Sequence, residues 1–227
     1  MDTDFSRRQM VQQQIRTWDV LDPSVLAVLT RLHRERYVPD GFEKLAFADM
    51  EIPLPHGQMM MKPVVEGRLL QALDLEPQHS VLEIGTGTGF LTACLAKLSA
   101  SVTTIDIFSD FISTAKSNLE DEQIENIELI CMDATIELPE GQFDAVAVTG
   151  SLPTFDTRLV NIVKPGGRIF VIVGNPPTMD ARIVTRISEY EWTIKSLFET
   201  DVLPFLNVSQ PSRFFLDIAN RIKTSEI

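Results

Sequence analysis

The sequence predicts an α/β protein built on a doubly wound, mostly parallel sheet, with an N-terminal helical cap and antiparallel strands toward its C-terminal end. Between residues 78 and 174, short apolar runs of strand length alternate with helical segments, as in strands joined by right-handed crossovers. A glycine-rich turn, EIGTGTG at residues 83–89, follows the first of these runs. We expect one domain over residues 1–227, with the cap and a covering loop in about 1–75 and the sheet in about 78–227.

The N-terminal part of the chain is predicted to be helical before it becomes irregular. Apolar residues recur at helical spacing from residue 5 to residue 18. Asp22 followed by Pro23 indicates a second helix, because aspartate accepts from free backbone N–H groups and proline suits a first turn. Repeated prolines predict an ordered but irregular segment over residues 37–63, and a further helix is expected over residues 64–73.

The central part of the chain carries the strands of the predicted sheet. They are expected at residues 80–84, 102–105, 127–131, 143–148 and 169–173, with helices at residues 90–98 and 111–119. Beyond Gly174 the pattern becomes that of antiparallel strands joined by short connections, at residues 182–187, 193–198 and 213–218.

The composition fits a globular protein without a large nucleic-acid surface. The chain has 32 acidic and 20 basic side chains and a net charge of −12, whereas phosphate contacts need a surplus of Lys and Arg. No apolar stretch suits a membrane span or a signal peptide, so we expect no membrane partner and a cytoplasmic location. The spacing of Cys94 and Cys131 suits no metal site, and no metal is expected.

Three acidic residues follow three successive predicted strands around the glycine turn. Glu83 ends the first strand, Asp106 ends the second, and Asp133 comes after the third. A carboxylate at Glu83 would repel a pyrophosphate but suits a ligand with a cationic amino-acid end. Asp106 can accept from both ribose hydroxyls, and Asp133 can accept from an adenine amino group. Either aspartate alone could be a helix cap or a solvated residue, but all three around one glycine turn favour a ligand site.

The spacing of the glycines argues against a dinucleotide ligand. The dinucleotide fingerprint needs a glycine where Phe90 stands, and here the third glycine, Gly89, comes one residue early. A dinucleotide oxidoreductase is therefore disfavoured.

Several motifs resemble those of a known family. The glycine turn, Asp106, FDAV at residues 143–146 and KPGGR at residues 164–168 resemble the successive motifs of class I methyltransferases. Two further regions are similar to protein-L-isoaspartate O-methyltransferases: the front of the chain, including RERYVP at residues 34–39, and VTGSLP at residues 148–153. The resemblance covers roughly residues 10–174.

This resemblance implies S-adenosylmethionine as the cofactor and the isoaspartyl carboxylate of damaged proteins or peptides as the acceptor. It implies cofactor contacts from Glu83, Gly85, Thr86, Gly87, Gly89, Asp106, Ile107, Asp133 and Ala134. It implies substrate contacts from Gln58, Met59, Lys62, Pro63 and Ser151, with Thr149 and Met61 at the catalytic positions.

The sequence departs from the family at Met61. Relatives typically carry a threonine, isoleucine, serine, glutamine, proline run after Gly57 and Gln58, whereas this chain reads MMMKP at residues 59–63. A methionine therefore replaces the family's active-site hydroxyl, and the segment around Pro204 and Phe205 also differs. Two alternatives follow: the same cofactor with a small molecule or another protein carboxylate as acceptor, or a binding module with impaired catalysis.

The implied chemistry needs no catalytic histidine. Methyl transfer from a sulfonium is an in-line displacement, so the protein has to align the reacting atoms and exclude water. A carboxylate acceptor is ionised at neutral pH and needs no general base. His33, His56 and His79 stand in no motif that pairs them with an acid, and His56, the only one near the expected site, is interpreted as a surface residue.

Overall fold

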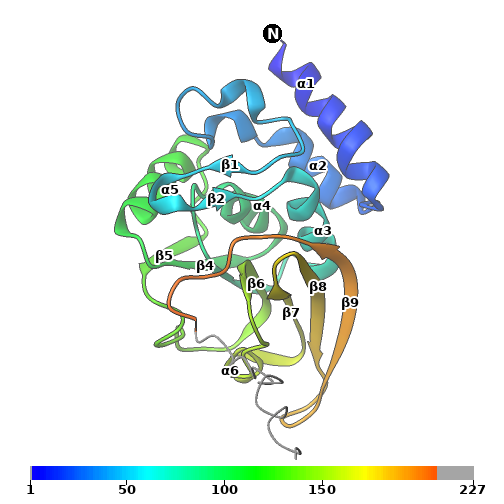
Figure 1. The fold of residues 1–227 in the computed structure, drawn as a ribbon, viewed down its shortest axis with the longest axis vertical. Coiled ribbons are helices and arrows are strands. Elements are labelled where there is room, and N and C mark those ends of the chain that lie inside the picture. Colours follow the sequence, from blue (N-terminus) through cyan, green and yellow to red (C-terminus); the bar gives the residue numbers. More distant parts are fainter. Residues whose placement is uncertain (1, 209–227) are drawn as a thin grey trace, which may run out of the picture.

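The computed structural model describes residues 2–208, and its main feature is one mixed sheet of seven strands (Figure 1). The strand order is β5-β4-β3-β6-β7-β8-β9. Neighbours from β5 to β7 pair in parallel, whereas β8 and β9 pair antiparallel. The strands are β3 (Ser80–Ile84), β4 (Ser101–Asp106), β5 (Ile127–Cys131), β6 (Phe143–Leu152), β7 (Val163–Asn175), β8 (Thr178–Arg186) and β9 (Trp192–Thr200). The predicted fold class is confirmed, while the strand expected at residues 213–218 lies outside the described residues.

Two strands and one helix have the bounds that the sequence predicts. β3, β5 and the helix α4 (Phe90–Leu98) begin and end at the predicted residues. β6 and β7 are longer than predicted, because Leu152 still pairs with Val173 and Phe143 already pairs with Val163. The added part of β7 contains the KPGG segment at residues 164–167, whose polar, proline and glycine residues lack the apolar pattern of a strand.

The N-terminal cap is helical, as predicted. α1 (Thr3–Met10) continues through a π turn (Val11–Ile15) and a 3-10 turn (Arg16–Trp18). α2 (Pro23–Arg31) is capped by Asp22, which accepts from two backbone N–H groups of the first turn. The segment predicted to be irregular contains short turns and a small hairpin of β1 (Ile52–Pro53) and β2 (Met59–Met60), and it ends at α3 (Pro63–Leu73).

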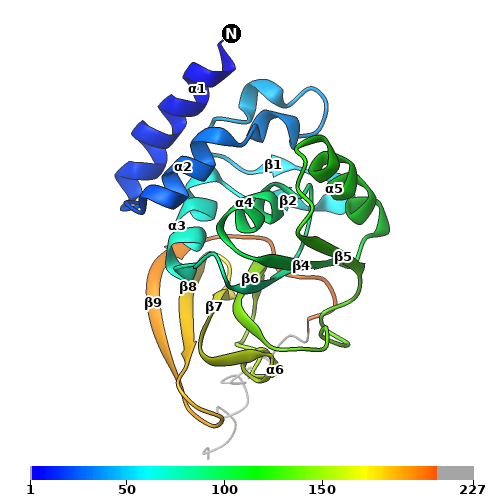
Figure 2. The same cartoon turned by 180° about the vertical axis from the view of Figure 1, so that it is seen from behind.

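One buried hydrophobic cluster lies on each face of the sheet, because successive side chains of a strand point to opposite faces. In β6, Ala145 and Ala147 belong to the cluster under α3, α4 and the N-terminal cap, whereas Val146 and Val148 belong to the other. The helical face is completed by α5 (Ser109–Asp121). The second face carries loops and a short helix, α6 (Arg158–Asn161), which was not predicted because one helical turn has no readable periodicity. Figures 1 and 2 place α1 and the β8–β9 hairpin at opposite ends.

The chain reverses its direction across the sheet next to β3. From β3 it continues outward to β4 and β5, and it then returns to β6 on the other side of β3. In open α/β sheets, ligands bind outside the carboxyl ends of the strands at such a point. Residues 202–207, which we call the strap, cross this edge, because the Ser151 N–H donates to the carbonyl of Leu203 and the Phe205 N–H donates to that of Ser151 (Figure 1, orange). Within residues 2–208, every helix is too short or too polar to cross a bilayer.

Candidate active site

A cavity of about 430 Å³ lies at the carboxyl edge of the sheet, where the strand order reverses. Its wall includes Gly85 after β3, Asp106 at the end of β4, Asp133 after β5, Thr149 in β6 and Phe205 in the strap. Ligand pockets of proteins commonly measure about 300–1,000 Å³, so this main cavity is large enough for a nucleoside-sized ligand.

A second, smaller cavity of about 50 Å³ adjoins the main one beneath residues 54–62, which we call the covering segment. Its wall includes Met61 from the covering segment and the buried carboxyl groups of Glu66 and Glu83. The two cavities share five lining residues: Leu54, Met59, Gly85, Gly87 and Thr149. These five residues form a wall that the two cavities have in common.

Gly85 and Thr149 are in close contact at this junction. Gly85 has a φ of +98°, and a Cβ at this position would lie 2.1 Å from the Thr149 Oγ1. The Thr149 hydroxyl lies 2.8 Å from the carbonyl of Ile84 and 3.0 Å from that of Gly85, and it donates to them. A register shift between β6 and β7 spans this part of β6, and such irregularities redirect side chains. Thr149 therefore fixes the backbone of the glycine turn.

Asp106 connects the end of β4 to the glycine turn. One carboxylate oxygen accepts from the Gly87 N–H at 3.0 Å, and the other accepts from the Phe108 N–H at 3.0 Å. The residue is 8% exposed, and this burial raises the pKa of the carboxyl group while the two backbone donors oppose the shift. Each oxygen retains further acceptor capacity toward the main cavity, as two ribose hydroxyls would require.

Asp133 follows β5 on the far side of the main cavity. Its Oδ1 accepts from both the N–H and the hydroxyl of Thr135, and its Oδ2 accepts from Asn207 in the strap at 2.8 Å. Partial burial alone would raise the pKa of Asp133, but these hydrogen bonds outweigh it and hold the pKa below its usual value. Asp133 is therefore a charged acceptor that already joins the strap to the sheet.

Glu83 lies deeper than Asp106 and Asp133 and borders only the smaller cavity. It is fully buried; its Oε2 accepts from the hydroxyls of Thr92 and Thr104, and its Oε1 has no partner among residues 2–208. Burial raises the pKa of Glu83 to about 8 against the effect of the two hydroxyls. A buried acceptor without a partner fits the ammonium of an amino-acid ligand, which would satisfy the oxygen and favour the charged carboxylate.

Glu83→Gln is expected to change how stability depends on pH. The folded-state pKa of about 8 lies above the ordinary value of 4.5 for a glutamate, so the carboxyl group contributes most to stability below pH 4.5 and its contribution falls as the pH rises through 8. The wild type should therefore lose on the order of 4 kcal/mol over this interval through this group, and Glu83→Gln should not. Denaturant unfolding at pH 5 and pH 9 measures the difference, and parallel pH profiles for the two proteins would show that Glu83 does not titrate in this interval.

The structure brings most of the predicted site residues to the two cavities. Those that border one or both are Gln58, Met59, Met61, Glu83, Gly85, Thr86, Gly87, Asp106, Ile107, Asp133, Ala134 and Thr149. Four others border neither. Gly89 precedes α4 and packs against Ala115. Lys62 immediately precedes α3, and Pro63 is its first residue. The Ser151 hydroxyl donates to the carbonyl of Val202 in the strap.

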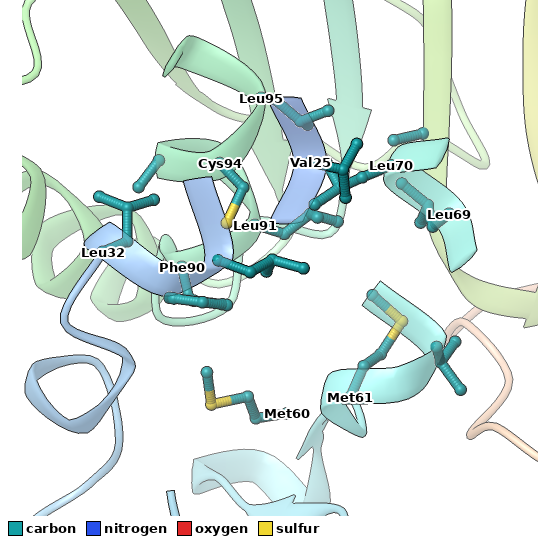
Figure 3. Close-up of a cluster of buried hydrophobic side chains, with 14 of the residues drawn as sticks. Val25, Leu32, Met60, Met61, Leu69, Leu70, Phe90, Leu91, Cys94 and Leu95 are labelled. Atoms are coloured by element: carbon teal, nitrogen blue, oxygen red, sulfur yellow. The ribbon is translucent and has the colours of Figure 1, made fainter. Parts of the chain in front are cut away.

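Met61 is 7% exposed and belongs to the large hydrophobic cluster rather than to the surface. In Figure 3, Met60 and Met61 lie on one side of this cluster, near the beginning of α3 and opposite Phe90 on α4. Met59, by contrast, borders both cavities. Met60 and Met61 thus place their thioethers in the core, whereas Met59 lies at the junction of the two cavities. All three methionines border the smaller cavity and give it an apolar wall.

Several lining residues were not found from the sequence. They comprise aromatic and aliphatic side chains and part of the strap: Leu54, Phe108, Phe111, Leu138, Phe155, Leu203, Pro204 and Phe205. Their signal is weak because apolar residues next to strand ends look like ordinary core positions. Within residues 2–208, no three His, Cys, Asp or Glu side chains gather as metal ligands.

His56 joins the covering segment to α5 and is more than an isolated surface residue. Its ring stacks on Phe108 with centroids 4.0 Å apart and meets the edge of Phe111, and its Nε2 lies 2.8 Å from the Asp110 carboxylate. Because Phe108 and Phe111 both border the main cavity, His56 holds the covering segment against that wall.

His56→Ala is expected to speed the release of a ligand from the main cavity. Loss of the aromatic stack, worth about 0.5–1.5 kcal/mol, should raise the dissociation rate of S-adenosylhomocysteine by about 2- to 12-fold. Stopped-flow measurement of that rate is the test, with His79→Ala as the control, since His79 accepts from the Glu76 N–H away from both cavities. Equal rates in both variants would contradict the role of His56.

A glycine turn, acidic residues at the carboxyl ends of three parallel strands and a cavity at that edge of the sheet define a class I methyltransferase. The sequence profile of the protein-L-isoaspartate(D-aspartate) O-methyltransferase family matches residues 5–210. The chain therefore belongs to this family.

Individual relatives agree with this assignment. The protein-L-isoaspartate O-methyltransferase of Syntrophus aciditrophicus is 34% identical over 81% of this chain and 84% of its own length. That of Methanoculleus marisnigri is 32% identical over 82% of this chain and 85% of its own length. A Plasmodium falciparum chain described as a beta-aspartate methyltransferase, solved with S-adenosyl-L-homocysteine, superposes with a TM-score of 0.73 at 18% identity, covering 87% of this chain and 97% of its own. At that identity, this last comparison supports the fold alone.

Proposed function

We propose that the protein transfers the methyl group of S-adenosylmethionine to the isoaspartyl carboxylate of damaged proteins and peptides. The observation that carries this proposal is the junction at Gly85 and Thr149, where a nucleoside-sized cavity meets a smaller cavity under the covering segment. Membership of the family supports the acceptor, and the relatives' names describe the same activity.

We place S-adenosylmethionine in the main cavity. Asp106 would accept from the ribose hydroxyls with Ile107 beside it, and Asp133 with Ala134 would meet the adenine. The amino-acid end would lie by Gly85, Thr86 and Gly87, with the unpaired Glu83 oxygen beneath it. Gly89 would act indirectly, by letting α4 begin close to α5.

The chain's own residues have to align the reactants and exclude water. S-adenosylmethionine, when bound, supplies a methyl group already activated by its sulfonium, and an ionised carboxylate can accept it without a general base. Thr149 fixes the glycine turn through its hydrogen bonds to the Ile84 and Gly85 carbonyls, and this turn would lie beneath the methyl group. Phe205 and Met59 would shield the junction from solvent, which strengthens electrostatic interactions inside it.

On the acceptor side we assign Gln58 and Met59 to direct contacts and Met61 to the wall of the smaller cavity. Lys62, Pro63 and Ser151 would act through the backbone that they hold, since none of them borders a cavity. We further propose that the cap and sheet work as one domain, because residues of both share a buried cluster. A cytoplasmic location fits the free thiols of Cys94 and Cys131.

A second candidate function keeps the cofactor and changes the acceptor. Its support is the apolar wall formed by Met59 and Met61 in place of the family's hydroxyl. Such a wall would suit a small molecule or another protein carboxylate with an apolar neighbour. A catalytically impaired binding module is the third candidate, and it rests on the same substitution.

A methyl-transfer assay with labelled S-adenosylmethionine separates these candidates. It uses two peptides that are identical except that one contains an isoaspartyl residue where the other contains an aspartyl residue. The proposed function requires base-labile label on the isoaspartyl peptide well above that on the aspartyl peptide. If S-adenosylhomocysteine binds but neither peptide is labelled, the isoaspartyl assignment is wrong, and a screen of small carboxylic acids decides between the remaining candidates.

A further inference from the structure

Arg34 is a fully buried cation beside the proposed acceptor site. It is 0% exposed and begins the 3-10 turn Arg34–Arg36. Its Nε donates to the carbonyl of Ala46 at 3.0 Å, its Nη2 donates to the carbonyl of Met61 at 2.7 Å, and its Nη1 pairs with Glu66. One guanidinium thus joins the cap, the covering segment and α3.

The surroundings of Arg34 leave its side chain little freedom. Its guanidinium carbon lies 4.7 Å from the centre of the Phe90 ring at the start of α4, within the range of a cation–π contact. A buried charge is costly unless it is paired and hydrogen-bonded, and here all three nitrogens have partners. A lysine has a single ammonium group, so it cannot donate to all three of these partners in the same geometry.

The hydrogen bond to Met61 holds one end of the covering segment. Among residues 2–208, other hydrogen bonds of this segment are local: the Leu54 N–H donates to the Gln58 carbonyl within the segment, and Met60 pairs with the adjoining Ile52 in the small hairpin. His56 ties its middle to Asp110 on α5. By binding the Met61 carbonyl, Arg34 fixes the backbone just before α3. This backbone carries Met59 and Met61, which line the smaller cavity.

Arg34 also balances the charge of the smaller cavity. Glu66 and Glu83 both border this cavity, and a carboxylate acceptor would approach two acids there. Burial raises the pKa of Glu66, and the charge of Arg34 opposes that shift. With Glu66 paired to Arg34, the acceptor meets an ion pair in place of a free carboxylate.

We propose that Arg34 is a positioning residue for methyl transfer, which holds the wall of the smaller cavity through the Met61 carbonyl and neutralises Glu66. This proposal rests on the proposed function for its kinetic consequence, but its structural part concerns the covering segment alone. Arg34 touches neither reactant in this arrangement, so its loss should disturb catalysis more than cofactor binding.

The test compares Arg34→Lys and Arg34→Met with a matched control, Arg186→Lys. Arg186 is 6% exposed and also donates to backbone carbonyls, those of Val160, Val163 and Ser188, but it lies outside both cavities. Three quantities are measured for each variant: hydrogen exchange of the amides of residues 59–62, affinity for S-adenosylhomocysteine, and kcat and KM for the isoaspartyl peptide. Arg34→Lys keeps the charge, so it provides the folded sample if Arg34→Met does not fold.

The proposal predicts faster exchange at residues 59–62 in Arg34→Lys and unchanged exchange there in Arg186→Lys. It also predicts a kcat lower by about 10- to 100-fold, because small misplacements of reacting groups are costly. Affinity for S-adenosylhomocysteine should stay within about threefold, which corresponds to less than 1 kcal/mol. Wild-type exchange at residues 59–62 in Arg34→Lys, or equal losses of kcat in Arg34→Lys and Arg186→Lys, would overturn it. If the wild type labels no isoaspartyl peptide, the proposed function fails, and the exchange data still decide whether Arg34 holds the segment.

Discussion

The Gly85→Ala variant is expected to lose about 2–5 kcal/mol of folding free energy and most of its affinity for S-adenosylhomocysteine. Two effects combine. An alanine at a φ of +98° adopts a backbone conformation that is unfavourable for L residues. Its Cβ would also lie 2.1 Å from the Thr149 Oγ1, so the hydroxyl has to leave the carbonyls of Ile84 and Gly85. Denaturant unfolding and calorimetric titration with S-adenosylhomocysteine measure the two losses.

Gly166→Ala is the matched control for this prediction. Gly166 has a φ of +85°, but a Cβ there would meet no atom of the described part of the chain within 4 Å. The control should therefore show only the backbone cost, about 1–2 kcal/mol, with unchanged ligand affinity. Equal destabilisation of the two variants, together with normal binding by Gly85→Ala, would show that the contact with Thr149 does not shape the site.

Asp106→Ala is expected to weaken binding of S-adenosylhomocysteine by about 1–3 kcal/mol, or about 5- to 150-fold. The variant loses the proposed charged hydrogen bonds to the ribose. It also removes the acceptors for the Gly87 and Phe108 N–H groups, which hold the turn and the start of α5 in place. The change in Kd by calorimetry is the measurement.

Asp144→Ala separates ligand binding from general stability. Asp144 also accepts from a backbone N–H, that of Ser80, and from Lys164, but it lies at the amino end of β6, away from the cavity. This control should unfold more easily and bind normally. If Asp106→Ala keeps wild-type affinity, the ribose is not held at the end of β4.

The sequence predicts the edge of the sheet well because the signals there are local. Apolar runs mark β3, β4 and β5, and each run has an acidic residue at or next to its carboxyl end. Asp106 and Asp133 therefore border the main cavity, as expected of residues at adjacent carboxyl ends. Glu83 was expected to join them, but it borders the smaller cavity instead. The alternation of β3 explains this: Leu82 and Ile84 face one side, so Glu83 faces α4, where Thr92 donates to it.

The parts of the site that were missed depend on contacts between distant parts of the chain. The strap reaches the cavity because the backbone and the hydroxyl of Ser151 in β6 are hydrogen-bonded to it. No local sequence pattern predicts this contact. The same contact explains why Ser151 borders no cavity, although its neighbours Gly150 and Leu152 do. Arg34 was recognised only as part of a motif, since its partners Met61 and Glu66 lie far along the chain.

A crystal structure of the protein with S-adenosylhomocysteine tests the central claim most directly, because it shows which side chains face each part of the ligand. The predicted result has the ribose hydroxyls on Asp106, the adenine amino group near Asp133 and the sulfur directed toward the junction of Gly85 and Thr149. A ligand bound elsewhere, or bound with its sulfur directed away from the smaller cavity, would contradict the proposal that methyl transfer takes place at this junction.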